Sequence, residues 1–279
     1  MNDDAPEKPA PEVPPAENKP VGAWQPFTPR GVAAFAQATW SRVLFLISVV
    51  AIIATVLVVW FIRANYFPSI SEAIENLPDE AAFQNGELTN VVSRVLTQKK
   101  YLSAVIDLEE TGNTGQTADL QLELRRDYFQ VCSLFGCGLF IYPSNTIYIG
   151  RSTAEPWWGA RQPIILALCG VITIVALLAS WGTFTLIYAP VAKITAYFAD
   201  RKLSFGESWR LAFAAQIPGA LLMCLTIFFY GIQVFDFIRF LFFFALHFLV
   251  VWIYLFASIY SFPPKSATTP ANINPFSTS

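Results

Sequence analysis

Uncharged apolar runs interrupt the polar pattern of the chain at four places, beginning at Val43, Gln162, Leu211 and Phe240. The hydrocarbon core of a bilayer is about 30 Å thick and is crossed by about 20 helical residues. Unpaired backbone groups are costly in lipid, so an apolar segment of this length crosses the membrane as a helix. The runs therefore predict four membrane-spanning helices, over residues 43–62, 163–189, 211–235 and 238–262.

The first run predicts an uncleaved signal anchor. It is longer than the apolar region of a signal peptide, and no A-x-A cleavage pattern follows it. Basic residues then predict the orientation, because Lys and Arg accumulate on the cytoplasmic side. Seven of them flank the predicted spans on the side of both termini, and four flank the other side. We expect both termini in the cytoplasm of a bacterium, and a multi-pass protein of the plasma (inner) membrane.

Residues 63–161 carry the patterning of a water-soluble domain. Ser69-x-x-Glu72 is the signature of a capping box and predicts a helix that Pro78 ends. Asn85-Gly86 predicts a tight hairpin turn. Tyr101 to Leu108 is typical of a strand, and Thr111 to Thr117 of a Gly-rich turn.

Two further patterns complete this domain. Leu120, Leu122 and Leu124 alternate with polar residues, which predicts a half-buried strand. Residues 138–142 and 146–149 predict a last hairpin around Pro143-Ser144-Asn145. We expect an antiparallel sheet, so the fold class is a membrane all-α protein with an inserted small α+β extracytoplasmic domain.

The remaining segments lie on the predicted cytoplasmic side. Residues 1–30 are rich in Pro and predict a disordered tail, residues 31–42 an interfacial lead-in, and residues 263–279 a second disordered tail. Residues 190–210 predict an amphipathic loop with a short helix on the inner leaflet. Within that loop, Ser204-x-x-Glu207 is a second capping box that should start the third spanning helix.

Composition narrows the function classes. Only 14% of the residues are charged and the net charge is −2, so no basic field is present that would attract nucleic acid. The sequence shows no motif that combines a nucleophile with an acid–base pair. The single histidine excludes metal sites built on several histidines. The sequence predicts no catalytic residues, no cofactor and no metal.

Polar residues inside the predicted spans form a candidate intramembrane site of His247, Gln216 and Pro218. A polar group in lipid is often functional, as a proton relay or a ligand contact. The alternative for His247 is a structural hydrogen bond to Gln216, to Gln233 or to a backbone carbonyl. For Pro218 the alternatives are a polar cavity or hinge and a plain packing kink.

Four other constellations carry two interpretations each. Cys132 and Cys137 could form a disulfide in an oxidising compartment or remain reduced. Asp236 and Arg239 fit a helix cap and anchor better than catalysis. A solvated acidic loop explains Asp107, Glu109, Glu110 and Asp119 better than a calcium site does. An anchor at the membrane interface explains Trp157-Trp158 better than carbohydrate stacking does.

The layout resembles the DUF1189 family of bacterial membrane proteins, which is distantly similar to Yip1-type proteins. The resemblance covers about residues 27–262. It rests on the Asn85-Gly86-Glu87-Leu88 turn, on Ile106-Asp107 before Thr111-Gly112, and on the Pro-containing third span with Gln216-Ile217-Pro218. It implies a protein without an established biochemical activity, some relatives of which accompany sugar-uptake systems, and it implies no catalytic residues.

The patterns favour a non-enzymatic sensor or accessory subunit with an extracytoplasmic binding domain. Its partners would be the lipid bilayer and either another membrane protein or further copies of the chain. The alternatives are a Yip1-like membrane-organising protein and a subunit of an oligomeric transporter. A transporter has little support, since the polar inventory of the spans is small and no inverted repeat is evident.

Overall fold

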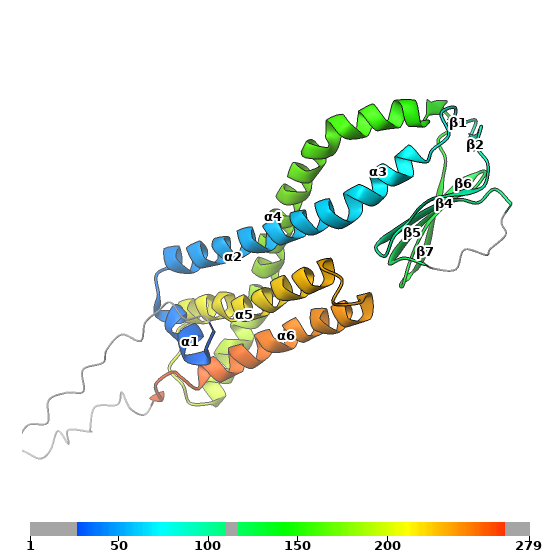
Figure 1. The fold of residues 1–279 in the computed structure, drawn as a ribbon. Helices are drawn as coiled ribbons and strands as arrows, with labels where there is room; N and C mark the ends of the chain where they lie inside the picture. Colours follow the sequence, from blue (N-terminus) through cyan, green and yellow to red (C-terminus); the bar gives the residue numbers. More distant parts are fainter. Residues whose placement is uncertain (1–26, 110–116, 266–279) are drawn as a thin grey trace, which may run out of the picture.

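The computed structural model describes residues 27–109 and 117–265. Within them the protein is mostly helical and carries a small β-sheet region at one end (Figure 1). Four helices are long and apolar enough to cross a membrane. The predicted tails, apart from residues 27–30 and 263–265, and the Gly-rich turn, apart from Thr117, lie outside the described residues.

Six α-helices and one π-helical turn make up the helical part of the described chain. They are α1 (Pro29–Gln37), α2 (Trp40–Phe61), η1 (Ile62–Tyr66), α3 (Phe67–Glu75), α4 (Arg151–Phe198), α5 (Phe205–Gly231) and α6 (Phe237–Ile259).

Helix α5 is the centre of the bundle. In its most apolar window 61% of the residues are buried, against 28% for the span that contains α2, 11% for α6 and 0% for α4. Small residues let the neighbouring helices approach closely, as in other membrane bundles. Ala212, Ala214 and Ala215 of α5 are fully buried in the main core. The other three helices thus leave most of their apolar surface facing outward, as lipid-facing helices do.

Helix α5 begins where its sequence predicts. Ser204 is the N-cap, its side chain accepts from the backbone N–H of Glu207, and the Glu207 carboxylate accepts from the backbone N–H of Ser204 at 2.7 Å. The predicted capping box is confirmed.

The predicted interfacial lead-in is a packed helix. Thr28 caps α1, and the Val32, Phe35 and Ala36 side chains are buried in the same core as α5. The Arg210 guanidinium donates to the carbonyl of Ala36 at 2.6 Å, at the C-terminal end of α1, where cations and unpaired carbonyls complement one another. Helix α1 is therefore part of the bundle.

The helix predicted to start at Ser69 does not start there. Helix α2 continues through η1 into α3 without a break, and Ser69 lies inside α3, where its hydroxyl donates to the Asn65 carbonyl at 3.2 Å. A helix already under way has no free N–H groups for a capping box to satisfy. The predicted end is close: α3 stops at Glu75, three residues before Pro78.

Helix α4 is longer than the predicted span. It is a single helix of 48 residues that contains Pro156, Pro163 and Pro190, and it includes the segment predicted to form a separate short helix on the inner leaflet. A proline removes one N–H and clashes with the preceding turn, which bends a helix but does not always end it. After Pro190 the helix still packs, since Ala192 and Ala196 are buried against the bundle core.

Two small sheets form the domain between α3 and α4. One has the strand order β2–β1–β8, from β1 (Ala82–Gln84), β2 (Glu87–Thr89) and β8 (Ile147–Tyr148). The other has the order β3–β4–β5–β6–β7, from β3 (Arg94–Gln98), β4 (Leu102–Ile106), β5 (Leu120–Leu124), β6 (Tyr128–Ser133) and β7 (Gly136–Ile141).

The turn at Asn85-Gly86 is confirmed, because β1 and β2 pair across it and both turn residues have positive φ angles. Two other predictions about the sheets are wrong. Strands β4 and β5 pair in parallel, so the larger sheet is mixed. The predicted last hairpin does not form, since β7 pairs with β6 and β8 pairs with β1. Local alternation shows which residues form a strand but not which strand lies beside it.

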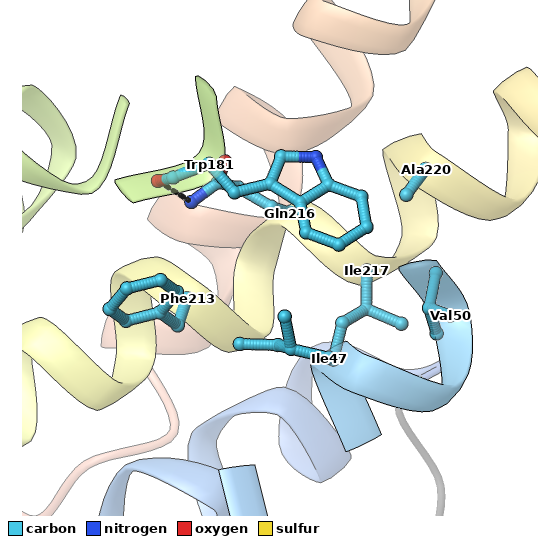
Figure 2. Close-up of a pocket in the computed structure, with 7 residues that line it drawn as sticks. All are labelled: Ile47, Val50, Trp181, Phe213, Gln216, Ile217 and Ala220. Carbon is cyan, nitrogen blue, oxygen red and sulfur yellow. Dashed lines mark hydrogen bonds between the residues drawn. The ribbon is translucent and has the colours of Figure 1, made fainter. Parts of the chain in front are cut away.

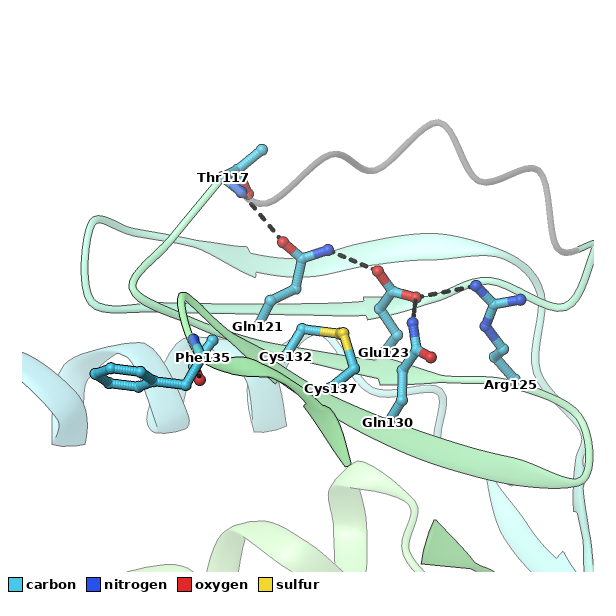
Figure 3. The surroundings of a disulfide bond; sticks show 9 residues. Thr117, Gln121, Glu123, Arg125, Gln130, Cys132, Phe135 and Cys137 are labelled. Carbon is cyan, nitrogen blue, oxygen red and sulfur yellow. Dashed lines mark hydrogen bonds and ion pairs between the residues drawn. A yellow bond between two sulfur atoms is a disulfide. The ribbon is translucent and has the colours of Figure 1, made fainter. Parts of the chain in front are cut away.

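Strand β5 does not have the predicted single buried face. Gln121 and Glu123 are buried, and the Glu123 carboxylate accepts from Gln121 at 2.7 Å, from Arg125 at 3.1 Å and from Gln130 (Figure 3). Leu122 packs on the opposite side against the small core of the domain. A buried carboxylate is stable only when such donors satisfy it, so both faces of β5 are packed.

The two ends of the bundle differ. The first and last described residues and the α4–α5 connection lie at one end, and the sheets lie at the other (Figure 1). At the first end, Lys193 donates to Leu203 O and Arg201 to Phe262 O at 2.8 Å. Residues that the sequence assigns to one membrane face therefore gather at one end of the fold.

Candidate functional site: the junction between the sheets and the helical bundle

The turn between β3 and β4 contacts the last turn of α5. The Lys100 ammonium donates to Phe235 O at 2.9 Å. The Tyr101 hydroxyl donates to the carbonyl of Tyr230 and lies 3.5 Å from that of Gly231. The last carbonyls of a helix lack partners within it and carry the negative end of its dipole. The Tyr101 hydroxyl thus stabilises the C-terminal end of α5, and the Lys100 ammonium binds the connection between α5 and α6.

The contact is reciprocal. The Tyr230 hydroxyl of α5 donates to the Asp119 carboxylate, which belongs to the sheet domain just before β5. Asp119 is held in place by the sheet, because its backbone N–H donates to Lys100 O at 2.9 Å. Each part of the molecule therefore donates a tyrosine hydroxyl to the other, and we call Lys100, Tyr101, Asp119 and Tyr230 the junction.

Aromatic rings surround these polar contacts. The Tyr101 ring is 5.3 Å from that of Phe61 and 5.1 Å from that of Tyr230, measured between centroids, and both pairs meet edge to face. Tyr101 is only 2% exposed. Burial, and after it the negative charge of Asp119, raises the pKa of Tyr101 to about 12, so its hydroxyl remains a donor at any physiological pH.

The β6–β7 hairpin reaches the same region. Cys132 and Cys137 are directly opposite each other on the two strands and form a disulfide, with their Cα atoms 4.0 Å apart (Figure 3). The hairpin turns at Leu134 and Phe135, and the ring of Phe135 is 6.1 Å from that of Phe237, the first residue of α6. A covalently closed hairpin thus touches the start of the last helix.

The polar residues predicted to form an intramembrane site have separate hydrogen-bond partners. The Gln216 side chain is only 6% exposed, and its amide nitrogen donates to the carbonyl of Trp181 at 3.2 Å (Figure 2). It also donates to Thr185 Oγ1 at 2.9 Å, and both partners belong to α4. His247 bonds to Phe244 O in its own helix. No hydrogen bond joins His247 to Gln216 or Gln233 in the described chain. Pro218 is buried inside an unbroken α5.

The other sequence candidates have structural contacts. Asp236 caps α6 by accepting from Arg239 N at 2.7 Å, and its carboxylate pairs with the Arg239 guanidinium at 3.6 Å, which confirms the predicted cap. Trp158 is not an interface anchor: it is buried, and its indole N–H donates to Ser71 Oγ of α3 at 3.0 Å. Trp157 is exposed and stacks with Arg161.

The predicted acidic loop is not one cluster. Asp107 is buried, Asp119 belongs to the junction and Glu109 lies on a separate exposed bend, while Glu110 is outside the described residues. Over residues 27–109 and 117–265, no group of three His, Cys, Asp or Glu side chains is arranged to hold a metal ion.

None of the protein-family models, curated proteins or solved structures compared with the chain matches it. The resemblance to the DUF1189 family therefore stays a prediction. The four long apolar helices indicate a membrane protein, and the junction defines it further as one whose sheet domain is bonded to the central helix of its bundle.

Sequence reasoning missed the junction. Tyr101 and Tyr230 are 129 residues apart, and neither belongs to a motif. One signal was available: Lys99-Lys100-Tyr101 forms a basic and aromatic turn immediately before a fully buried strand, where a polar turn exposed to water would be usual.

Proposed function

We propose that this chain is a non-enzymatic sensor or accessory subunit of a bacterial plasma membrane. Both termini lie in the cytoplasm, and the sheet domain lies outside and binds a partner. The observation that carries the proposal is the junction, because a domain hydrogen-bonded in both directions to the central helix can transmit its bound state to the bundle. The accumulation of basic side chains at the opposite end supports the orientation.

The partner surface is the exposed strand β7. It pairs only with β6 among the described strands, and all six of its residues are exposed, including Leu139, Phe140 and Ile141. A sheet edge with exposed apolar side chains readily pairs with another chain. Because the hairpin turn touches the start of α6, this partner would be another membrane protein or a second copy of the chain.

Orientation and the disulfide are tested together in intact cells that express the full chain. We expect an impermeant maleimide to label the protein only after treatment with an impermeant reductant, because Cys132 and Cys137 are bonded to each other. A double variant, Cys132→Ser with Cys137→Ser, should remain unlabelled and is the control for the free thiols Cys169 and Cys224. Labelling that requires lysis as well as reduction would place the sheet domain inside and end the proposal.

Binding at β7 is tested by a photocrosslinking amino acid at Ile141, whose side chain is 85% exposed. We expect one discrete crosslinked product in membranes. Its mass would distinguish a second copy of the chain from a different protein. The matched control carries the same amino acid at Val92, which is 67% exposed and precedes β3 at the opposite edge of the sheet. No product at Ile141, or the same products at both positions, would refute binding at this edge.

A further inference from the structure

A cavity lies between the four long helices. It has a volume of about 360 Å³ and is lined by residues of α2, α4, α5 and α6. Ligand pockets in proteins begin at about this volume. The lining residues lie near the middle of their helices, for example Ala54 in α2 and His247 in α6. The cavity is therefore at mid-membrane depth if these helices cross the bilayer.

Most of the cavity wall is apolar or aromatic. Phe184, Phe244 and Phe248 form one side, where the ring of Phe248 is 5.5 Å from those of the other two. Met223 and Ile227 of α5 complete the apolar part. No Lys, Arg, Asp or Glu is among the lining residues. A cavity of this chemistry disfavours charged ligands and accepts an apolar chain.

Besides the Ser180 and Tyr188 hydroxyls and the Trp181 indole, two polar side chains with acceptor atoms line the same cavity, and the first is Gln216. Its amide nitrogen lies within 3.2 Å of Trp181 O and of Ala212 O, and 2.9 Å from Thr185 Oγ1. Because two of these partners are carbonyls, only the NH₂ group fits there, and this sets the orientation of the amide. The Oε1 atom, an acceptor, then has no hydrogen-bond partner in the described chain.

The second is His247. Its Nδ1 atom is bonded to Phe244 O, which accepts only, so the proton is on Nδ1. In this neutral tautomer Nε2 is an acceptor, and no partner for it occurs in the described residues. The cavity therefore combines a mostly apolar wall with two acceptors and with the donor groups of Ser180, Trp181 and Tyr188, and it offers no charged side chain.

We propose that this cavity binds a neutral amphiphile with one apolar chain and a hydroxyl head group. The hydroxyl donates to His247 Nε2 or Gln216 Oε1, and the chain lies along the phenylalanine side. A hydroxyl is favoured over an ether or ester head because it alone can donate to these two acceptors, and it can also accept from the hydroxyls of the lining. This site belongs to the bundle and does not depend on a partner of the sheet domain.

The test uses the full chain in phosphatidylcholine nanodiscs with a diazirine-bearing hexadecanol as photoprobe. We expect the label on α4 and α5 segments that line the cavity. Unlabelled hexadecanol should compete about fivefold better than hexadecyl methyl ether, which has the same chain but no donor. Equal competition by the two compounds, or label spread over all outward faces, would overturn the proposal.

Variants separate the cavity from general lipid contact. Ala220→Phe fills the cavity and should abolish competable labelling, whereas Leu225→Phe, on the 55% exposed outer face of α5, should leave it unchanged. His247→Phe should reduce the preference for the alcohol over the ether. Unchanged labelling in Ala220→Phe would contradict the proposal. If that variant does not fold, the comparison of alcohol and ether in the wild-type chain still decides.

Discussion

Replacing Gly219 by alanine is expected to lower the free energy of unfolding of the bundle by about 1–3 kcal/mol, the usual cost of overpacking a core. A Cβ atom at this position would lie 2.7 Å from a methyl group of Val251 and 2.8 Å from the backbone oxygen of His247. The methyl group can rotate away, but the oxygen belongs to the backbone of α6. Helices α5 and α6 would have to separate, which a detergent-titration unfolding curve would measure.

Gly182→Ala is the matched control for this prediction. Gly182 also lies inside a long helix, α4, but a Cβ atom there meets nothing within 4 Å. Alanine favours helix over glycine by about 1 kcal/mol, so this variant should be neutral or stabilising. An equal loss of stability in both variants would show that α5 and α6 do not pack as closely as the structure has them.

Replacing Tyr230 by phenylalanine is expected to loosen the sheet domain from the bundle. The change keeps the ring and removes the hydroxyl that donates to Asp119. A hydrogen bond to a charged group contributes about 1.5–3 kcal/mol, and Asp119 would lose this donor at a half-buried site. We expect faster amide hydrogen exchange in β4 and β5, and separate thermal transitions for sheet and bundle where the wild type shows one.

Tyr260→Phe is the control, because Tyr260 is 63% exposed at the end of α6, far from the sheets. It should leave exchange in β4 and β5 unchanged. A double-mutant cycle between Tyr230→Phe and Asp119→Ala should show a coupling energy about as large as the loss in Tyr230→Phe, because the double variant loses the shared hydrogen bond only once. Additive effects of the two substitutions would mean that the hydrogen bond does not hold the junction together.

Helix α5 connects the two proposed sites. Its last turn forms the junction through Tyr230, and its middle lines the cavity through Gln216 and Ala220. A rigid helix that touches both sites is a physical element through which each could influence the other. We therefore expect that Tyr230→Phe also changes the competition between hexadecanol and its ether, measured as in the photolabelling experiment.

Local signals in the sequence were sufficient wherever structure depends on neighbouring residues. Uncharged runs located the four long helices, the Ser204 and Glu207 pair located the start of α5, and Asn85-Gly86 located a hairpin turn. In each case the physical cause acts between residues that are close in the chain. The causes are the length of an apolar run, a capping hydrogen bond and a positive φ angle.

Only the tertiary structure decided which segments lie side by side. Partners distant in sequence determine three features: the parallel pairing of β4 with β5, the continuation of α4 beyond Pro190 and the burial of α1. The junction and the cavity are of the same kind, because Tyr101 meets Tyr230 and Gln216 meets Thr185 only after the chain has folded. Contacts of this kind leave no periodicity, since packing and hydrogen bonding between distant residues constrain each position separately.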